Sequence, residues 1–257
     1  MIHLKTPEEI DIIRRGGAII AGLFLEMEGR VVSGVSTLQL DQFSDEYIRS
    51  HEGAVPAFKG LYGFSGSVCA SVNEEVVHGI PRADCILAAG DIISIDVGVK
   101  LDGFCSDSAW TFPVGEIDSE TAQLLTVTEE SLDMAVEATL VDNHVGDIGA
   151  AVVDRVSGTG MAIIRDLVGH GVGRDVHEEP QVPNVGMPGT GPLLREGMVL
   201  AIEPMLSLGT DQIRTLDDRW TVVTRDATRS AHFEHTVAIT ADGPKILTCL
   251  PVRASAG

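Results

Sequence analysis

Apolar residues recur at helical spacing in four stretches of the chain. The first follows the sequence TPEE at residues 6–9, where the threonine can cap a helix, the proline fits its first turn and the acids face the positive end of its dipole. This start predicts a helix whose buried stripe consists of Ile10, Ile13, Ala18, Ala21 and Leu25.

Three more helices are predicted from their start signals. The sequence STLQ at residues 36–39 is a capping box and opens a helix that we expect to run through Leu40, Phe43 and Tyr47 to a stop at Gly53. Residues 117–139 are predicted to be helical from the DSE start at 118–120, and residues 146–157 form a further helix opened by Asp147.

Strand-like patterns fill the regions between these helices. Residues 54–115 indicate loops and strands, and further strands are predicted at 198–205, 219–224 and 232–240. The order helix, helix, strands therefore occurs twice. It predicts an α+β fold in which one domain, residues 1–257, contains two structurally similar halves.

Residues 93–112, ISIDVGVKLDGFCSDSAWTF, indicate a β-hairpin with acids inside apolar strands. The Asp102-Gly103 step is typical of a two-residue turn. With that turn, position 98 faces 107 and position 96 faces 109, so Asp96 and Asp107 become diagonal neighbours on one face. A one-residue bulge would break this pairing.

Two carboxylates within reach of each other in a core strand are unfavourable unless one is protonated or a cation lies between them. For either aspartate alone, capping a turn or pairing with an arginine is a sufficient explanation. The rest of the chain favours a cation, because two more acids occupy apolar strands, Glu203 in VLAIEPM and Glu234 in AHFEHTVAIT.

Histidines complete this candidate ligand set. The stretch VGHGVGRDVHEEP contains His170 and His177 among glycines that allow close approach of backbone or ligand. Two aspartates, two glutamates and one histidine can hold two divalent ions. This oxygen-rich set suits Mn, Fe, Co or Zn and differs from a closed structural zinc site, which uses several thiolates.

Composition limits the classes of partner. The chain has 257 residues, 44% of them hydrophobic and 22% charged, and its formal net charge is −20. Such a charge repels nucleic acid and anionic lipid, so we expect neither as a partner. The four cysteines form no CxxC pair, the N-terminal residues contain no apolar signal-peptide region, and no apolar run reaches membrane-spanning length. We therefore expect a cytoplasmic protein with reduced thiols.

Ordered motifs along nearly the whole chain resemble those of the type I methionine aminopeptidases, a group of the pita-bread metallopeptidases. They are LKTPEEIDIIRRGG, SVNEEVVHGIP, DIISIDVGVKLDGFCSDSAWTFPVG, LVGHGVGRDVHEEPQVPNVG, LREGMVLAIEP and SAHFEHTVAIT. The resemblance implies two pseudo-symmetric α/β halves around a curved antiparallel sheet. It also implies two divalent metal ions, Co, Mn, Fe or Zn, without naming the native one.

The resemblance assigns roles to individual residues. It implies that the metal ligands are Asp96, Asp107, His170, Glu203 and Glu234, with Asp107 and Glu234 bridging. Glu203, His177 and His78 are the expected catalytic residues, and the two histidines also contact substrate. The expected methionine pocket contains Phe64, Cys69, Val176 and Trp220, where Phe64 replaces a common tyrosine and Val176 a common aromatic residue.

The implied activity is metal-dependent removal of the initiator methionine from nascent chains with a small second residue. A monomer that associates transiently with ribosomes, without binding nucleic acid itself, fits this activity. Two alternatives stay open at this point. They are an X-Pro aminopeptidase or prolidase of the same fold and a peptide-binding relative without catalysis. An α+β domain whose acids are structural is discounted, because all seven motif positions would have to be coincidence.

Overall fold

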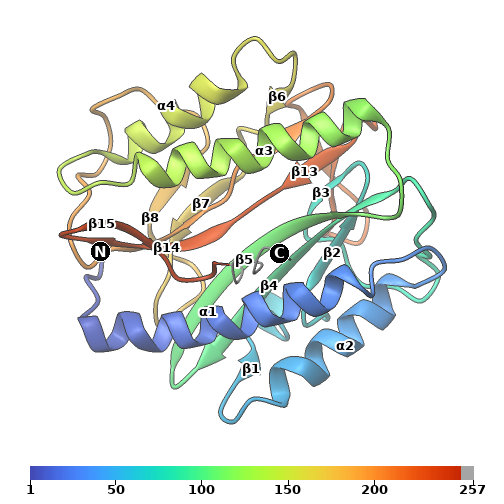
Figure 1. Cartoon of the computed structure of the whole chain (residues 1–257), viewed down its shortest axis with the longest axis horizontal. Coiled ribbons are helices and arrows are strands. Elements are labelled where there is room, and N and C mark those ends of the chain that lie inside the picture. The colour runs from blue at the N-terminus through green and yellow to red at the C-terminus, as the bar shows by residue number, and fades with distance from the viewer. Residues whose placement is uncertain (250–257) are drawn as a thin grey trace, which may run out of the picture.

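The computed structural model describes residues 1–249, which form two similar halves, each with a pair of helices and its own strands (Figure 1). Helices α1 and α2 lie on one side of β5 and β14, and α3 and α4 lie on the other. The helices are α1 Pro7–Glu28, α2 Thr37–Arg49, α3 Ser119–Glu137 and α4 Val145–Val156, with the short 3-10 turn η1 Leu61–Gly63.

The strands of the first half are β1 Val55–Pro56, β2 Cys69–Val72, β3 Glu75–Val77, β4 Ile92–Leu101 and β5 Phe104–Pro113. Those of the second half are β6 Ala162–Ile163, β7 Val168–Gly171, β8 Glu178–Pro183, β9 Val199–Ile202, β10 Met205–Ser207, β11 Ile213–Thr215, β12 Val222–Thr224, β13 Ser230–His232, β14 His235–Thr240 and β15 Gly243–Ile246. Helix, helix, strands is thus repeated as the sequence predicts.

The helix starts follow the predicted caps with one shift. Thr6 and Ser36 each form a capping box, and Asp118 caps α3. Helix α4 begins at Val145, earlier than predicted, because the side chain of Asp147 accepts a hydrogen bond from the backbone N–H of His144 and so acts from the third helical position. Helix α2 ends at Arg49, ahead of the predicted stop at Gly53.

The buried face of α1 differs from the predicted stripe. Ile13 and Ala21 are buried, but Ala18 and Leu25 are exposed. Gly16 and Gly17 lie on the buried face instead. A methyl group on Gly16 would come within 2.6 Å of the Ser106 Oγ atom, and one on Gly17 would collide with the Leu247 carbonyl. The helix approaches the strands closely because both residues lack a side chain.

The β4–β5 hairpin forms in the predicted register. Gly98 pairs with Asp107 and Asp96 pairs with Ala109. Asp102 and Gly103 have φ values of 48° and 86°, as a two-residue turn with positive φ at both positions requires. No bulge intervenes, and Asp96 and Asp107 are therefore diagonal neighbours. Strand β4 also pairs with β1 and β2, which places both aspartates inside a four-stranded sheet.

Two of the predicted strands are each interrupted at a glutamate. The segment 198–205 breaks at Glu203-Pro204 between β9 and β10, and 232–240 breaks at Phe233-Glu234 between β13 and β14. The breaks lie opposite each other, because β9 pairs with β14 and β10 with β13. Pro204 has no N–H to continue a ladder. Neither glutamate therefore lies within a continuous strand, and both occupy the seam between two sheets.

Each half has its own hydrophobic core. One core joins α1 and α2 to β4 and β5, and the other joins α3 and α4 to β9 and β14. A third cluster, which includes Phe58, Phe64, Cys69 and Val176, packs where the two halves meet. No helix in residues 1–249 has both the length and the apolarity to cross a bilayer.

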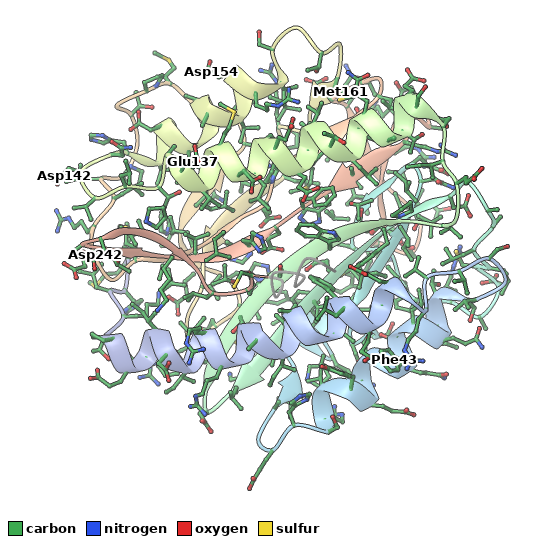
Figure 2. The ribbon with its side chains drawn as sticks, in the orientation of Figure 1. Phe43, Glu137, Asp142, Asp154, Met161 and Asp242 are labelled. Carbon is green, nitrogen blue, oxygen red and sulfur yellow. The ribbon has the colours of Figure 1, made fainter. Side chains whose placement is uncertain are left out.

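The acidic surplus is visible at the surface of the molecule. Glu137, Asp142, Asp154 and Asp242 are exposed on this surface (Figure 2). These exposed carboxylates are solvated and contribute to the negative net charge. All four cysteines are free thiols, as expected.

Candidate metal centre

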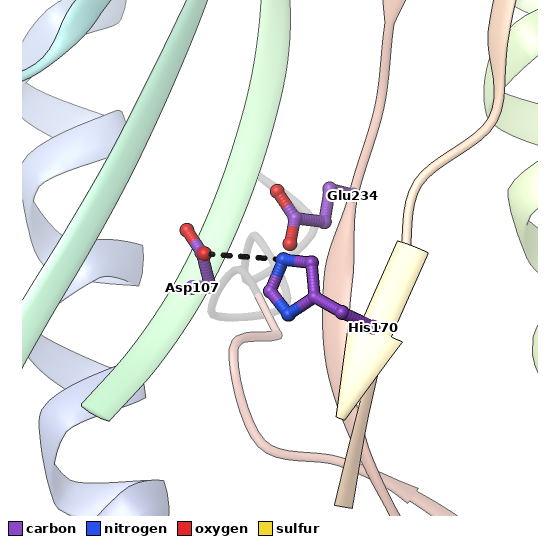
Figure 3. A group of neighbouring side chains, drawn as sticks. All are labelled: Asp107, His170 and Glu234. Atoms are coloured by element: carbon purple, nitrogen blue, oxygen red, sulfur yellow. Dashed lines mark ion pairs between the residues drawn. The ribbon is translucent and has the colours of Figure 1, made fainter. Parts of the chain in front are cut away.

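Five side chains from separate segments of the chain converge on one cavity of about 270 Å³. Its lining includes Asp96 of β4, Asp107 of β5, His170 of β7, and Glu203 and Glu234 at the two strand breaks. Asp107, His170 and Glu234 point toward one another (Figure 3), and each offers a ligand atom within 4.8 Å of the other two. The structure thus brings together all the residues that the sequence predicts as ligands.

Hydrogen bonds between the halves fix Asp107 relative to Glu234. The Asp107 N–H donates to the Thr236 Oγ1 atom at 3.0 Å, and that hydroxyl donates to the Asp107 carbonyl at 2.7 Å. The Glu234 N–H donates to the Ala109 carbonyl at 2.9 Å, and the Ser108 hydroxyl donates to the Glu234 carbonyl at 2.5 Å. Strand β5 of one half is thereby joined to β14 of the other.

His170 is oriented as a neutral ligand. Its Nδ1 atom lies 3.0 Å from the carbonyl oxygen of Gly171, which can only accept, so Nδ1 carries the proton. The lone pair is then on Nε2, which lies 3.5 Å from Glu203 Oε1 and 3.9 Å from Asp107 Oδ2. Burial, reinforced by nearby His177, lowers the pKa of His170 to about 4, so the ring stays neutral at physiological pH.

The carboxylates have oxygens that nothing else in the described chain satisfies. Asp96 Oδ1, Asp107 Oδ1 and Glu234 Oε1 are buried and have no hydrogen-bond partner among residues 1–249. Burial raises the pKa of all four carboxyls above their ordinary values, and repulsion among them contributes to the rise for Asp107, Glu203 and Glu234. Unpaired buried oxygens around one neutral imidazole are what a divalent cation would satisfy. The donor set therefore fits such an ion.

His78 and His177 lie beside the carboxylates on the cavity wall. His78 has a positive φ of 59°, and Gly79 follows it where a Cβ would collide with the Ala70 carbonyl. Burial lowers the pKa of both histidines, and His177 lowers that of His78 further. Both are therefore neutral at physiological pH, and each has one N–H to donate.

The far end of the cavity is apolar. Phe64 and Trp220 form its wall with their rings edge to face, 5.1 Å apart, and Cys69 is buried beside them. Val176 is buried in the same apolar cluster but does not line the cavity. The sequence therefore predicts three of the four pocket residues as lining, and Val176 packs behind them.

Other lining residues were not predicted from the sequence. They are Phe58, Leu61, Tyr62, Val77, Leu167, Val168 and Met205. Tyr62 is 76% exposed and stacks on His177, with ring centroids 5.9 Å apart. The glycines at 60 and 63 were a signal for an exposed turn that presents this side chain.

His232 is a further residue missed by sequence reasoning. Its ring is buried, its Nε2 atom lies 3.7 Å from Glu203 Oε2, and neither ring nitrogen has a hydrogen-bond partner within residues 1–249. Burial lowers its pKa to about 3, with a smaller contribution from His78. Its spacing of two residues from Glu234 was the available signal, because alternate residues of a strand share a face.

Comparisons with known proteins agree with this geometry. The model of metallopeptidase family M24 matches residues 11–241. The methionine aminopeptidase of Clostridium perfringens is 50% identical, over 97% of this chain and 100% of that one. Methionine aminopeptidase 1 of Bacillus subtilis is 49% identical, over 96% of this chain and 99% of that one.

Solved structures show the same relationship. The crystal structure of methionine aminopeptidase from Thermotoga maritima has a TM-score of 0.94 and 43% identity, covering 96% of this chain and 99% of that one. The prolidase from Pyrococcus furiosus has a TM-score of 0.77 at 23% identity. Only 65% of the prolidase chain is covered, against 96% of this one, and the likeness extends to the fold alone.

Proposed function

The chain belongs to metallopeptidase family M24, and from its similarity to methionine aminopeptidases we propose that it removes the N-terminal methionine from polypeptides. It is a metal-dependent hydrolase with the pita-bread α+β fold. The observation that carries the proposal is a cavity with carboxylates and neutral histidines at one end and an apolar wall at the other.

The apolar wall provides the selectivity. Phe64, Cys69 and Trp220 present carbon and sulfur surfaces that match an unbranched thioether side chain. A methionine side chain held there would place its peptide bond beside the carboxylates and histidines. We further propose that substrates with a small second residue are preferred, as the resemblance to the type I methionine aminopeptidases implies.

Asp96, Asp107, His170, Glu203 and Glu234 would hold the metal. A bound divalent ion lowers the pKa of water to about 7 and polarises a carbonyl oxygen. Glu203 would accept the proton of the attacking water and pass it to the leaving amine. The N–H of His177 would stabilise the developing oxyanion, and His78 would hydrogen-bond to the backbone near the scissile bond.

We also propose the number of metal ions, the oligomeric state and the cellular location, and each can be measured directly. Two ions per chain, drawn from Co, Mn, Fe or Zn, would be counted by elemental analysis after reconstitution. A monomer would be recognised by light scattering. Work on nascent chains in the cytoplasm, with transient ribosome contact, would be tested by cosedimentation with ribosomes that display Met-Ala N-termini.

The first test of the activity is cleavage of Met-Ala-Ser by metal-free protein to which each of these metals is added separately. Ala-Ala-Ser tests the methionine pocket, and Ala-Pro tests the prolidase alternative. We expect metal-dependent release of methionine from the first peptide only. Release of alanine from Ala-Pro instead, or no release with any metal that binds, would refute the proposal.

Two variants test the assignment of residues. Glu203→Gln keeps the side-chain size but removes the base, and His177→Ala removes the donor. Each should lower kcat roughly 10²–10⁴-fold. Glu130→Gln, in an exposed ion pair between α3 and α4, is the control and should leave kcat unchanged. Wild-type turnover in both site variants would mean that these roles are wrongly assigned.

A further inference from the structure

Lys5, in the segment before α1, is a charged residue with almost no exposure. Its side chain is 4% exposed, and its Nζ atom lies 2.7 Å from Glu178 Oε2 and 3.0 Å from the His3 carbonyl. The backbone N–H of Lys5 donates to the Gly197 carbonyl at 2.7 Å. The N-terminal segment is therefore held at this residue by both main chain and side chain.

The second oxygen of Glu178 organises the turn between β7 and β8. Glu178 Oε1 accepts a hydrogen bond from the Arg174 N–H at 2.8 Å. Gly173 lies against this ion pair, where a methyl group would come within 2.6 Å of the Lys5 Cε atom. The Gly173 carbonyl accepts a hydrogen bond from the Cys105 N–H at 2.7 Å. The carboxylate thus connects Lys5 to the backbone of residues 173–174.

This turn carries His177, which immediately precedes Glu178. The ring of His177 is exposed on the cavity side, where it contacts the rings of Tyr62 and His170 at centroid distances of 5.9 and 4.5 Å. Ring contacts of this kind hold a side chain less precisely than hydrogen bonds do. The position of the ring therefore depends on the backbone that the Lys5–Glu178 pair holds.

We propose that Lys5 is a positioning residue for His177, acting through Glu178. Lys5 itself is not among the residues that line the metal cavity. It makes the N-terminal segment part of the scaffold that presents the oxyanion donor. This inference rests on the role given to His177 in the proposed function.

A double-mutant cycle tests the inference. Lys5→Met keeps an unbranched side chain and removes the charge. We expect kcat for Met-Ala-Ser to fall roughly 10- to 100-fold, with KM nearly unchanged, because a small misplacement of a catalytic group has effects of that size. In the His177→Ala background the same change should lower kcat less than about twofold, since the positioned group is absent. An equal loss in both backgrounds would overturn the proposal.

Lys5→Met leaves the largely buried Glu178 carboxylate without its charged partner, which destabilises folded proteins. Lys5→Met/Glu178→Gln avoids this charge and keeps an Oε1 acceptor for the Arg174 N–H. It should show the same loss of kcat with a thermal midpoint close to that of wild type. Arg155→Met, which breaks the Arg155–Glu130 pair on α3 and α4, is the matched control and should leave kcat unchanged. Wild-type kcat in a folded double variant would overturn the proposal.

Hydrogen exchange separates failure of this inference from failure of the proposed function. If wild-type protein releases no methionine, the proposed activity is wrong, but the scaffold can still be measured. In Lys5→Met the amide of Arg174 should exchange roughly tenfold faster than in wild type, since its bond to Glu178 is loosened. Unchanged exchange across residues 172–178 would refute the positioning role, whatever the activity.

Discussion

Asp41 links helix α2 to the loop that builds the apolar end of the cavity. Its Oδ1 atom accepts two hydrogen bonds, from the Ser67 N–H at 2.6 Å and from the Val68 N–H at 3.1 Å. Asp41 is 7% exposed, and Ser67 and Val68 are fully buried. The loop continues directly into Cys69 of the cavity wall. We therefore predict that Asp41→Ala damages both stability and the methionine pocket.

The magnitude follows from the two donors that would lose their acceptor. A buried N–H without a partner costs about 1–3 kcal/mol, so Asp41→Ala should lower the free energy of unfolding by about 2–6 kcal/mol. A loss of about 3 kcal/mol corresponds to a fall in Tm of roughly 6–12 °C for a chain of this size.

Asp41→Asn is the matched control. Both bonds go to one oxygen, which asparagine retains. Burial raises the pKa of Asp41, with hydrogen bonds to Val68 and Ser67 opposing the rise, so the charge itself is disfavoured there. Asparagine should therefore cost less than about 1 kcal/mol.

The assay is urea and thermal unfolding of the metal-loaded protein, together with KM for Met-Ala-Ser. We expect the alanine variant to unfold earlier and its KM to rise, while the asparagine variant behaves like wild type in both measurements. If alanine and asparagine were equally destabilising, the charge rather than the shared acceptor would matter. The reasoning would then fail.

Three further outcomes are expected. Burial alone would raise the pKa of Asp45, but hydrogen bonds from Lys59 and other neighbours lower it to about 2. The ionised Asp45 should therefore stabilise the fold above its ordinary pKa of 3.8, and this contribution should be lost as pH falls toward 2. Asp45→Asn should make stability less dependent on pH over this range in acid titrations followed by circular dichroism. Gly98→Ala would place a methyl group 2.6 Å from the Phe58 ring. It should cost about 1–3 kcal/mol and raise KM, and Phe58→Leu should relieve both effects. Metal binding should release protons from the four buried carboxyls, whose pKa values are raised. Calorimetric heats that are identical in buffers of different ionisation enthalpy would contradict this.

Turn and cap residues predicted the features of the fold that depend on neighbouring residues in the sequence. The Asp102-Gly103 turn set the hairpin register, and with it the placement of Asp96 beside Asp107. The breaks at Glu203 and Glu234 were not predictable from apolar patterning, because the residues on both sides of each break are still buried. What changes at a break is the sheet that the strand joins, and that depends on tertiary pairing.

The candidate site shows a similar division. Acids within apolar runs signalled four of the five expected ligands, because a buried carboxylate is costly unless it is paired. His170 was signalled by the glycines that surround it. Tyr62, Met205 and His232 were missed. A tyrosine in a loop, a methionine in a strand and a lone histidine are each common without any functional role. Only the folded chain shows that Tyr62 and Met205 line the cavity and that His232 lies beside Glu203.

The ligands are divided between the two halves of the molecule. Asp96 and Asp107 belong to the half with α1 and α2, and the other three belong to the half with α3 and α4. An ion bound at the seam is therefore a crosslink between two separate hydrophobic cores. Neither half could then open without giving up ligands, so bound metal would add to the coupling that the hydrogen bonds between β5 and β14 already provide, and chelation would weaken it.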